Sequence, residues 1–153
     1  MNRISRRIEE ELGDINLAIR RALQAWEKFE QSDDELYVDS VALNIQGAYT
    51  GLERLFEQIA KDVDDSRPHD INWHQQLLEQ MAVEISGVRP AVISLSSRNF
   101  LDEYRRFSHV VRHTYATKLE ADQVSELIES VSQVFAQIST ELLAFAKFLE
   151  QQG

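Results

Sequence analysis

The apolar residues of this chain recur every three or four positions, which is the period of an amphipathic α-helix. The first such run is Ile4, Ile8, Leu12, Ile15, Ile19, Leu23, Trp26 and Phe29. Alternation of apolar and polar residues, which marks β-strands, is almost absent, and only five glycines and two prolines occur in 153 residues. The sequence therefore predicts an all-α protein.

Four long stretches carry this period, and short polar segments connect them. After the first run, the pattern continues over residues 41–63, 98–115 and 124–149, with a shorter helix expected over 73–85. Long helices joined by short connections favour antiparallel packing. We predict an antiparallel up-and-down four-helix bundle with an additional short helix, folded as a single domain over residues 1–153.

Local signals set the expected helix boundaries. Residues 32–35 (Ser-Asp-Asp-Glu) form a capping-box pattern, which would start the second helix. Asn72 is the expected N-cap of the short helix, and Gly87 suits a left-handed residue just past its end. Gly47 and Gly51, four residues apart, predict a close approach between the second helix and a neighbour in the bundle.

Composition excludes several classes of protein. The chain has a net charge of −10 and no cysteine, so disulfides and thiolate metal sites are excluded. No apolar run approaches the ~20 residues that span a bilayer, and the N-terminal residues lack the apolar segment of a secretory signal. We expect a cytoplasmic protein with no membrane contact. The acidity also argues against coating of duplex nucleic acid, which rests on many contacts between basic side chains and phosphates.

The segment of residues 98–118 carries a net positive charge, unlike the chain as a whole. Residues 98–118 contain five basic and two acidic residues, and residues 105–115 hold three arginines and two of the four histidines. On a helix, Arg106, His109 and His113 fall within about 60° of one another, opposite the apolar side chains. Imidazole and guanidinium groups on one outward face favour an anionic ligand such as a phosphodiester.

Plainer interpretations stay open at this stage. The face can be an ordinary solvated surface whose arginines pair with nearby acids. His109 and His113, at positions i and i+4, could instead chelate a metal ion, but this needs a third ligand and the surrounding arginines repel a cation. Trp73 beside His74 is either a core anchor with a polar neighbour or a platform on which a base stacks.

The run Arg105 to Tyr115 (RRFSHVVRHTY) resembles the signature helix of the HepT-like group of HEPN domains. Residues 49–56 and 73–81 are similar to other recurrent segments of this group, so the resemblance covers roughly residues 40–120. It implies an all-α bundle that commonly dimerises. The resemblance also implies that, as in many members, the protein is a metal-independent endoribonuclease. The motif of these enzymes is an arginine, then four to six residues, then a histidine. In HepT-type members the histidine is followed by one residue and a tyrosine (His-x-Tyr).

The resemblance assigns roles to individual residues. His113, Thr114 and Tyr115 match the His-x-Tyr ending, and Arg106 precedes His113 by six intervening residues. Similar sequences typically have an arginine at the position of Ser108, so this chain departs from the pattern there. HepT-like proteins are typically paired with a small nucleotidyltransferase that can attach AMP to the motif tyrosine, which makes Tyr115 the modification candidate.

We therefore expect the toxin of a toxin–antitoxin pair, a HepT-like ribonuclease that needs no metal or other cofactor. Its partners would be single-stranded RNA, a second copy of the chain and a cognate nucleotidyltransferase antitoxin. His113 would act as general acid or base with help from His109, and Arg106, or failing that Arg112, would stabilise charge on the phosphate. Arg105 and Arg112 would bind the substrate. The alternatives are a catalytically inactive helical adaptor for a nucleotidyltransferase and a purely structural helical protein.

Overall fold

The computed structural model describes residues 2–152, and within them it contains five α-helices and no β-strand. The helices are α1 (Arg3–Ser32), α2 (Leu36–Asp62), α3 (Trp73–Met81), α4 (Leu95–Arg112) and α5 (Ala121–Gln152), with a short 3-10 helix η1 (Ala116–Lys118) before α5. An isolated bridge joins Ile85 to Arg89. The predicted all-α class is confirmed.

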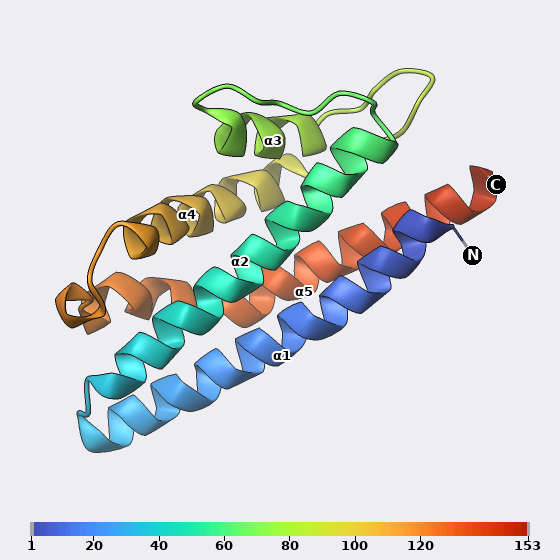
Figure 1. Cartoon of the computed structure of the whole chain (residues 1–153). Coiled ribbons are helices and arrows are strands. Elements are labelled where there is room, and N and C mark those ends of the chain that lie inside the picture. Colours follow the sequence, from blue (N-terminus) through green and yellow to red (C-terminus); the bar gives the residue numbers. More distant parts are fainter. Residues whose placement is uncertain (1, 153) are drawn as a thin grey trace.

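Successive long helices run in opposite directions, as Figure 1 shows. α1 packs against α2 and α5, α4 packs against the same two helices, and the short α3 packs on α2 and α4. This is the predicted up-and-down four-helix bundle with an additional short helix. None of the helices described by the structure is both long enough and apolar enough to cross a membrane.

The apolar stripes of the helices meet in a single core. Its largest fully buried side chains are Tyr49, Tyr104, Phe56, Ile8, Ile45, Leu52, Leu55, Ile59, Leu77, Leu78, Met81 and Ile93. Two acidic residues interrupt this core: Glu11 of α1 and Glu53 of α2 are both buried. Charged side chains are rarely buried unless they are paired. Glu11 lies near Arg7 and Arg54, and the partners of Glu53 define the site described below.

Only one of the two α2 glycines lies at a helix contact. A Cβ atom on Gly51 would be 2.7 Å from Oε1 of Glu11 and 3.6 Å from Cγ1 of Ile15, whereas nothing lies within 4 Å of the same position on Gly47. The predicted close approach is therefore confirmed for Gly51, where α1 crosses α2. It is wrong for Gly47, which is exposed.

The predicted capping box does not form, whereas Asn72 is the N-cap of α3 as predicted, although its side chain makes no cap bond. At the start of α2 the capping box does not form, since Glu35 makes no side-chain cap and Oδ1 of Asp34 accepts the N–H of Leu36 instead. At the start of α3, Asn72 makes no side-chain cap either, and Oδ1 of Asp70 accepts the N–H of Asn72. Short side chains of this kind bond readily to a backbone N–H two residues ahead.

α3 ends at Met81, four residues earlier than predicted, because neighbouring groups take its last carbonyls. Arg89 donates hydrogen bonds to the carbonyls of Gln80 and Val83, and the N–H of Val92 donates to the carbonyl of Met81. Carbonyls at the end of a helix need such partners. Gly87 has the expected left-handed backbone (φ 78°), but it lies in the turn between residues 85 and 89 and not at the helix end.

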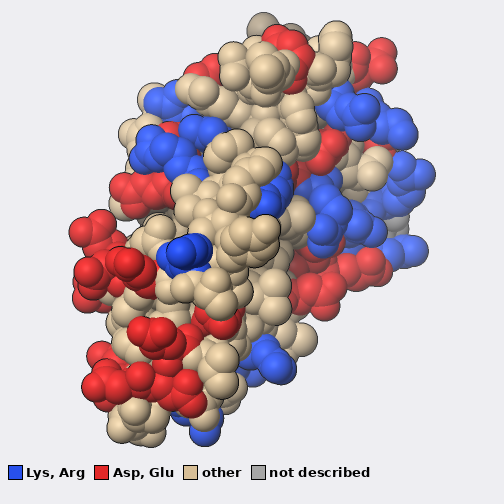
Figure 2. Space-filling model, turned by 60° about the vertical axis from the view of Figure 1, so that its left-hand side comes forward, with Lys and Arg blue, Asp and Glu red and all other residues tan. Residues whose placement is uncertain are grey.

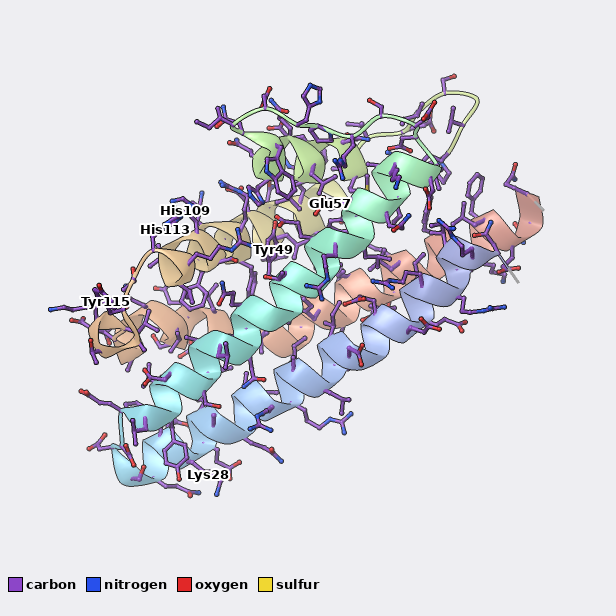
Figure 3. All side chains as sticks on the ribbon, in the orientation of Figure 1. Lys28, Tyr49, Glu57, His109, His113 and Tyr115 are labelled. Carbon is purple, nitrogen blue, oxygen red and sulfur yellow. The ribbon has the colours of Figure 1, made fainter. Side chains whose placement is uncertain are left out.

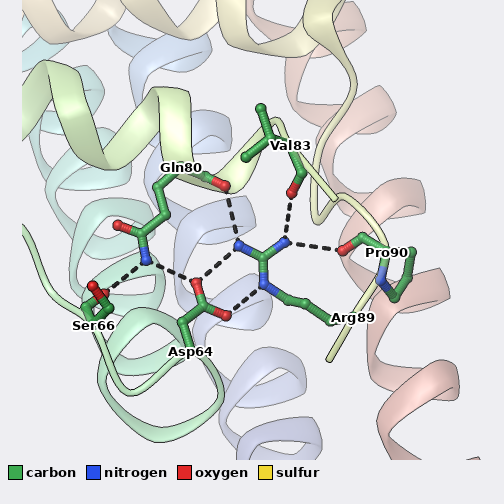
Figure 4. Close-up of polar contacts among 6 residues, drawn as sticks. All are labelled: Asp64, Ser66, Gln80, Val83, Arg89 and Pro90. Carbon is green, nitrogen blue, oxygen red and sulfur yellow. Dashed lines mark hydrogen bonds and ion pairs between the residues drawn. The ribbon is translucent and has the colours of Figure 1, made fainter. Parts of the chain in front are cut away.

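Arg89 is the centre of a buried polar cluster that fixes this loop (Figure 4). Its Nε lies 2.6 Å from Oδ1 of Asp64 and its Nη2 lies 2.8 Å from Oδ2, and neither side chain is exposed. The remaining guanidinium donors bond to the carbonyls of Gln80, Val83 and Pro90. All five donors of an arginine are thereby used. We call this cluster, with Arg89 and Asp64 at its centre, the Arg89 clamp.

Candidate functional site

Three helices meet at a small cavity that includes one histidine and two arginines of the basic segment. It is lined by Tyr49 and Glu53 of α2, His74 of α3, and Arg105, Ser108, His109 and Arg112 of α4. We call it the Glu53 cavity. Its volume of about 30 Å³ is room for roughly one water molecule. A larger ligand would therefore lie across its mouth and reach in with a single atom.

Glu53 is the acidic centre of this cavity. Its side chain is only 5% exposed, and its Oε2 lies 2.8 Å from Nδ1 of His74. On the other side, its Oε1 lies 3.8 Å from Nη2 of Arg112. A buried carboxylate is costly unless it is hydrogen-bonded and paired with positive charge. Glu53 therefore links α2 to both α3 and α4, and it holds a histidine and an arginine on opposite sides of one carboxylate.

His74 is held in a fixed orientation. Its Nδ1 faces Glu53, and its ring stacks on that of Trp73 with centroids 3.6 Å apart and an interplanar angle of 28°. Trp73 is half-buried and packs against the core, so it is a core anchor. Because Nδ1 is engaged, Nε2 is the nitrogen of His74 that remains for another ligand.

Tyr49 closes the buried side of the cavity. Burial raises the pKa of its hydroxyl far above the usual range, and the negative charge of Glu53 raises it further, while Arg105 lowers it slightly. The hydroxyl is therefore protonated at all physiological pH values. Tyr49 contributes a neutral polar wall and not a base.

Ser108 occupies an unusual environment. Its side chain is buried, and its hydroxyl is the one buried side-chain polar atom in the described part of the chain that has no hydrogen-bond partner. Buried polar atoms are normally satisfied, so each exception needs an explanation. Ser108 is one of the residues that line the Glu53 cavity.

The arginines of α4 are partly neutralised. Nε of Arg105 and Nη1 of Arg106 each lie 2.8 Å from an oxygen of the same Asp102. With Arg112 beside Glu53, three arginines share two carboxylates, so one positive charge remains in excess. Arg105 and Arg112 line the cavity, whereas the side chain of Arg106 is 61% exposed outside it.

His109 of α4 and His113, which directly follows this helix, lie side by side, as Figure 3 shows. His109 lines the cavity, and its ring centroid is 4.5 Å from that of His113, which caps the C-terminus of α4. Both residues are exposed. Tyr115 does not continue the helix as predicted, because α4 ends at Arg112. It lies beyond the helix end, ahead of η1, and is 82% exposed.

Acidic side chains gather on one part of the surface. Residues 27–39, around the turn between α1 and α2, contain six acids and one lysine, and residues 118–129 add four acids and one lysine. These two segments meet around one pocket. Figure 2 shows acidic groups gathered at the lower left of this face, while acidic and basic groups are mixed over the rest of it. An anion is therefore attracted to one part of the surface and repelled from another.

Within residues 2–152, no group of three or more His, Cys, Asp or Glu side chains could hold a metal ion. His109 and His113 thus lack the third ligand that the chelation hypothesis requires. His109 shares the Glu53 cavity with Arg105 and Arg112 as well as with the carboxylate of Glu53.

Comparison with known proteins identifies the family. A family model described as HepT-like protein matches residues 40–149, which is more than two thirds of the chain. The chain belongs to the HepT-like family. The matched range contains every residue that lines the Glu53 cavity of this HepT-like protein. No curated protein and no solved structure matches the chain.

Sequence reasoning did not select Glu53 or Tyr49 as site residues of this HepT-like protein, and it weighed His74 only as a neighbour of Trp73. A usable signal was nonetheless present. Glu53 lies four residues after Tyr49 and three before Phe56, so it falls on the apolar stripe of α2. An acid on such a stripe is buried and needs a cationic partner.

Proposed function

We propose that this HepT-like protein is an endoribonuclease that acts as the toxin of a toxin–antitoxin pair. The observation that carries the proposal is the Glu53 cavity, where imidazoles from two helices and two guanidinium groups surround one buried carboxylate. Imidazole can transfer protons near neutral pH, and guanidinium can stabilise the negative charge that develops on a phosphate. Membership of the HepT-like family supports the toxin role.

The proposed chemistry uses the RNA's own 2′-hydroxyl as the nucleophile. His113 serves as a general acid or base, and His109 beside it assists or positions the phosphate. Arg106 stabilises charge on the reacting phosphate, while Arg105 and Arg112 bind the RNA backbone at the cavity. The substrate is single-stranded, because one short basic strip on an acidic protein cannot grip a long duplex.

The proposed partners are a second copy of the chain and a nucleotidyltransferase antitoxin. A two-fold dimer would bring two α4 helices to one groove and double its positive charge. Leu95, Phe100 and Val110 of α4 are exposed apolar residues that could contribute to such an interface. The high exposure of Tyr115 supports its role as the residue that a nucleotidyltransferase modifies.

Cleavage of single-stranded RNA in EDTA tests the proposal. Wild-type protein is expected to cut the RNA, and His113→Ala is expected to lose at least about 100-fold in rate, because general acid–base catalysis typically contributes 10²- to 10⁴-fold. Arg106→Ala is expected to lose at least about tenfold, which corresponds to about 1.4 kcal/mol. Arg21→Ala on α1 is the matched control and is expected to cut at the wild-type rate.

Other results would contradict the ribonuclease proposal or the role of Arg106. If the wild-type protein binds single-stranded RNA and leaves it intact, the ribonuclease proposal is wrong and the adaptor function replaces it. The unpartnered Ser108, in place of an arginine, is the observation that favours the adaptor. If only Arg106→Ala keeps the wild-type rate, Arg106 is not the arginine that contacts the phosphate.

A further inference from the structure

Cleavage of RNA by its 2′-hydroxyl needs two proton transfers at opposite sides of phosphorus. The attacking and leaving oxygens lie roughly in line, so the base and the acid must approach from different directions. His109 and His113 cannot readily fill both positions, because they lie on one helix with ring centroids 4.5 Å apart. A second proton-transfer group has to come from another element.

His74 is the imidazole that α3 supplies to the same cavity. It faces the α4 residues Arg105, His109 and Arg112 across the Glu53 cavity. The side chain of His74 is 30% exposed, so a ligand at the cavity mouth can reach it. The two cavity arginines are on α4, beside His109, whose ring centroid lies 4.5 Å from that of His113.

The surroundings of His74 are those of a base. Glu53 accepts a hydrogen bond at Nδ1, which fixes the tautomer and leaves Nε2 free to take a proton. When Nε2 takes that proton, the adjacent buried carboxylate stabilises the imidazolium, as the aspartate does in a serine protease triad. Trp73 fixes the ring plane by stacking. An ordinary surface histidine would need neither of these constraints.

We propose that His74 is the general base of the RNA cleavage reaction and that Glu53 is its positioning residue; this inference rests on the ribonuclease function proposed above. Nε2 of His74 removes the proton of the 2′-hydroxyl while the 2′-oxygen forms a bond to phosphorus. The bond from phosphorus to the 5′-oxygen breaks, and that oxygen takes a proton from protonated His113. The products are a 2′,3′-cyclic phosphate and a free 5′-hydroxyl. After the reaction His74 is protonated and His113 is neutral, the reverse of their starting states.

Two substrates separate the base from the acid. On RNA, His74→Gln and His113→Ala should each lose at least about 100-fold in kcat. On uridine 3′-(4-nitrophenyl phosphate), whose leaving group needs no acid, His113→Ala should recover most of the wild-type rate while His74→Gln should not. Glutamine can keep the hydrogen bond to Glu53, so His74→Gln tests proton transfer with the fold preserved, and thermal unfolding verifies this.

Glu53→Gln tests the positioning residue. Glu53→Gln should lower kcat on both substrates with little change in KM. A separate test is the bell-shaped dependence of kcat on pH, which should lose one limb in His74→Gln. Loss of folding would instead lower the melting temperature and the amount of active protein. His69→Gln is the matched control, since His69 lies in the loop before α3, bonded to the carbonyl of Arg67, and should keep the wild-type rate on both substrates.

The experiment separates failure of the ribonuclease proposal from failure of the role assigned to His74. A wild-type protein that cuts neither substrate overturns the ribonuclease proposal together with this inference. An active wild type, an inactive His113→Ala and a His74→Gln variant at the wild-type rate overturn the assignment of His74 alone. A His74→Gln variant that is deficient on RNA but normal on the nitrophenyl substrate also overturns it, because His74 would then be the acid.

Discussion

The hydroxyl of Ser108 makes no hydrogen bond in the folded protein. The group is buried on α4, in a residue that lines the Glu53 cavity, and it has no hydrogen-bond partner. Leaving a buried polar group unsatisfied costs about 1–3 kcal/mol. The unused hydroxyl is therefore a local defect in an otherwise satisfied interior.

We predict that Ser108→Ala increases the free energy of unfolding by about 1 kcal/mol, because the variant removes the unsatisfied hydroxyl and keeps the shape of the side chain. Urea unfolding measures this change. Ser97→Ala on the same helix is the matched control: Ser97 is equally buried, but its Oγ accepts a hydrogen bond of 2.9 Å from Gln137, so this variant should be destabilised by about 1 kcal/mol. Destabilisation of Ser108→Ala would show that the hydroxyl does have a partner in solution.

The residues of the site differ in how far sequence could predict them. Arg106, His109 and His113 are successive turns of one helix, so a local pattern was enough to group them. His74 joins His109 only through the packing of α3 on α4, and Glu53 joins both from α2. No local pattern fixes such distances between helices, which is why the buried half of the site had to come from the structure.

The helices themselves were largely predictable, because apolar spacing is a property of each element. The residues at which the helices end were harder to predict from the sequence. α3 stops at Met81 because Arg89, eight residues later, takes carbonyls at its end, and α4 stops at Arg112 although its period suggests Tyr115. Boundaries depend on which partners satisfy the terminal carbonyls, and these are tertiary contacts.

The Arg89 clamp should dominate the stability of the segment between α3 and α4. We predict that Arg89→Ala lowers the free energy of unfolding by about 3–5 kcal/mol, because it leaves Asp64 buried without its cation. Arg3→Ala is the matched control, since Arg3 forms an equally short 2.6 Å pair with Asp62 but its side chain is 79% exposed; exposed pairs are worth up to about 1 kcal/mol. Equal losses in chemical denaturation of the two variants would contradict the prediction.

At the scale of the whole molecule, the basic side chains of the site belong to a strongly acidic protein. Its net charge is −10, and the arginines at the site are Arg105, Arg106 and Arg112. Such a distribution limits how many phosphates one protomer can neutralise. Long-range repulsion from the acidic end further restricts where RNA can lie.

This distribution predicts a shallow salt dependence for RNA binding by one protomer. Contact of three arginines with phosphates gives a slope of log K against log salt of about −2 for a single strand, so affinity should fall about 20-fold between about 50 and 200 mM salt. Fluorescence anisotropy with labelled single-stranded RNA measures the slope, and Arg112→Ala should make it shallower by about 0.7. A wild-type slope steeper than about −4 would mean that the RNA contacts far more of the protein than this site.

The saturation of Arg89 has a consequence for the geometry of catalysis. With every guanidinium donor engaged, Arg89 fixes the segment that links α3 to α4, and this segment connects the helix that carries His74 to the helix that carries His109. A lesion at Arg89 would therefore loosen the alignment of groups it never touches. Under the proposed ribonuclease function, such a lesion would lower kcat in a protein that still folds.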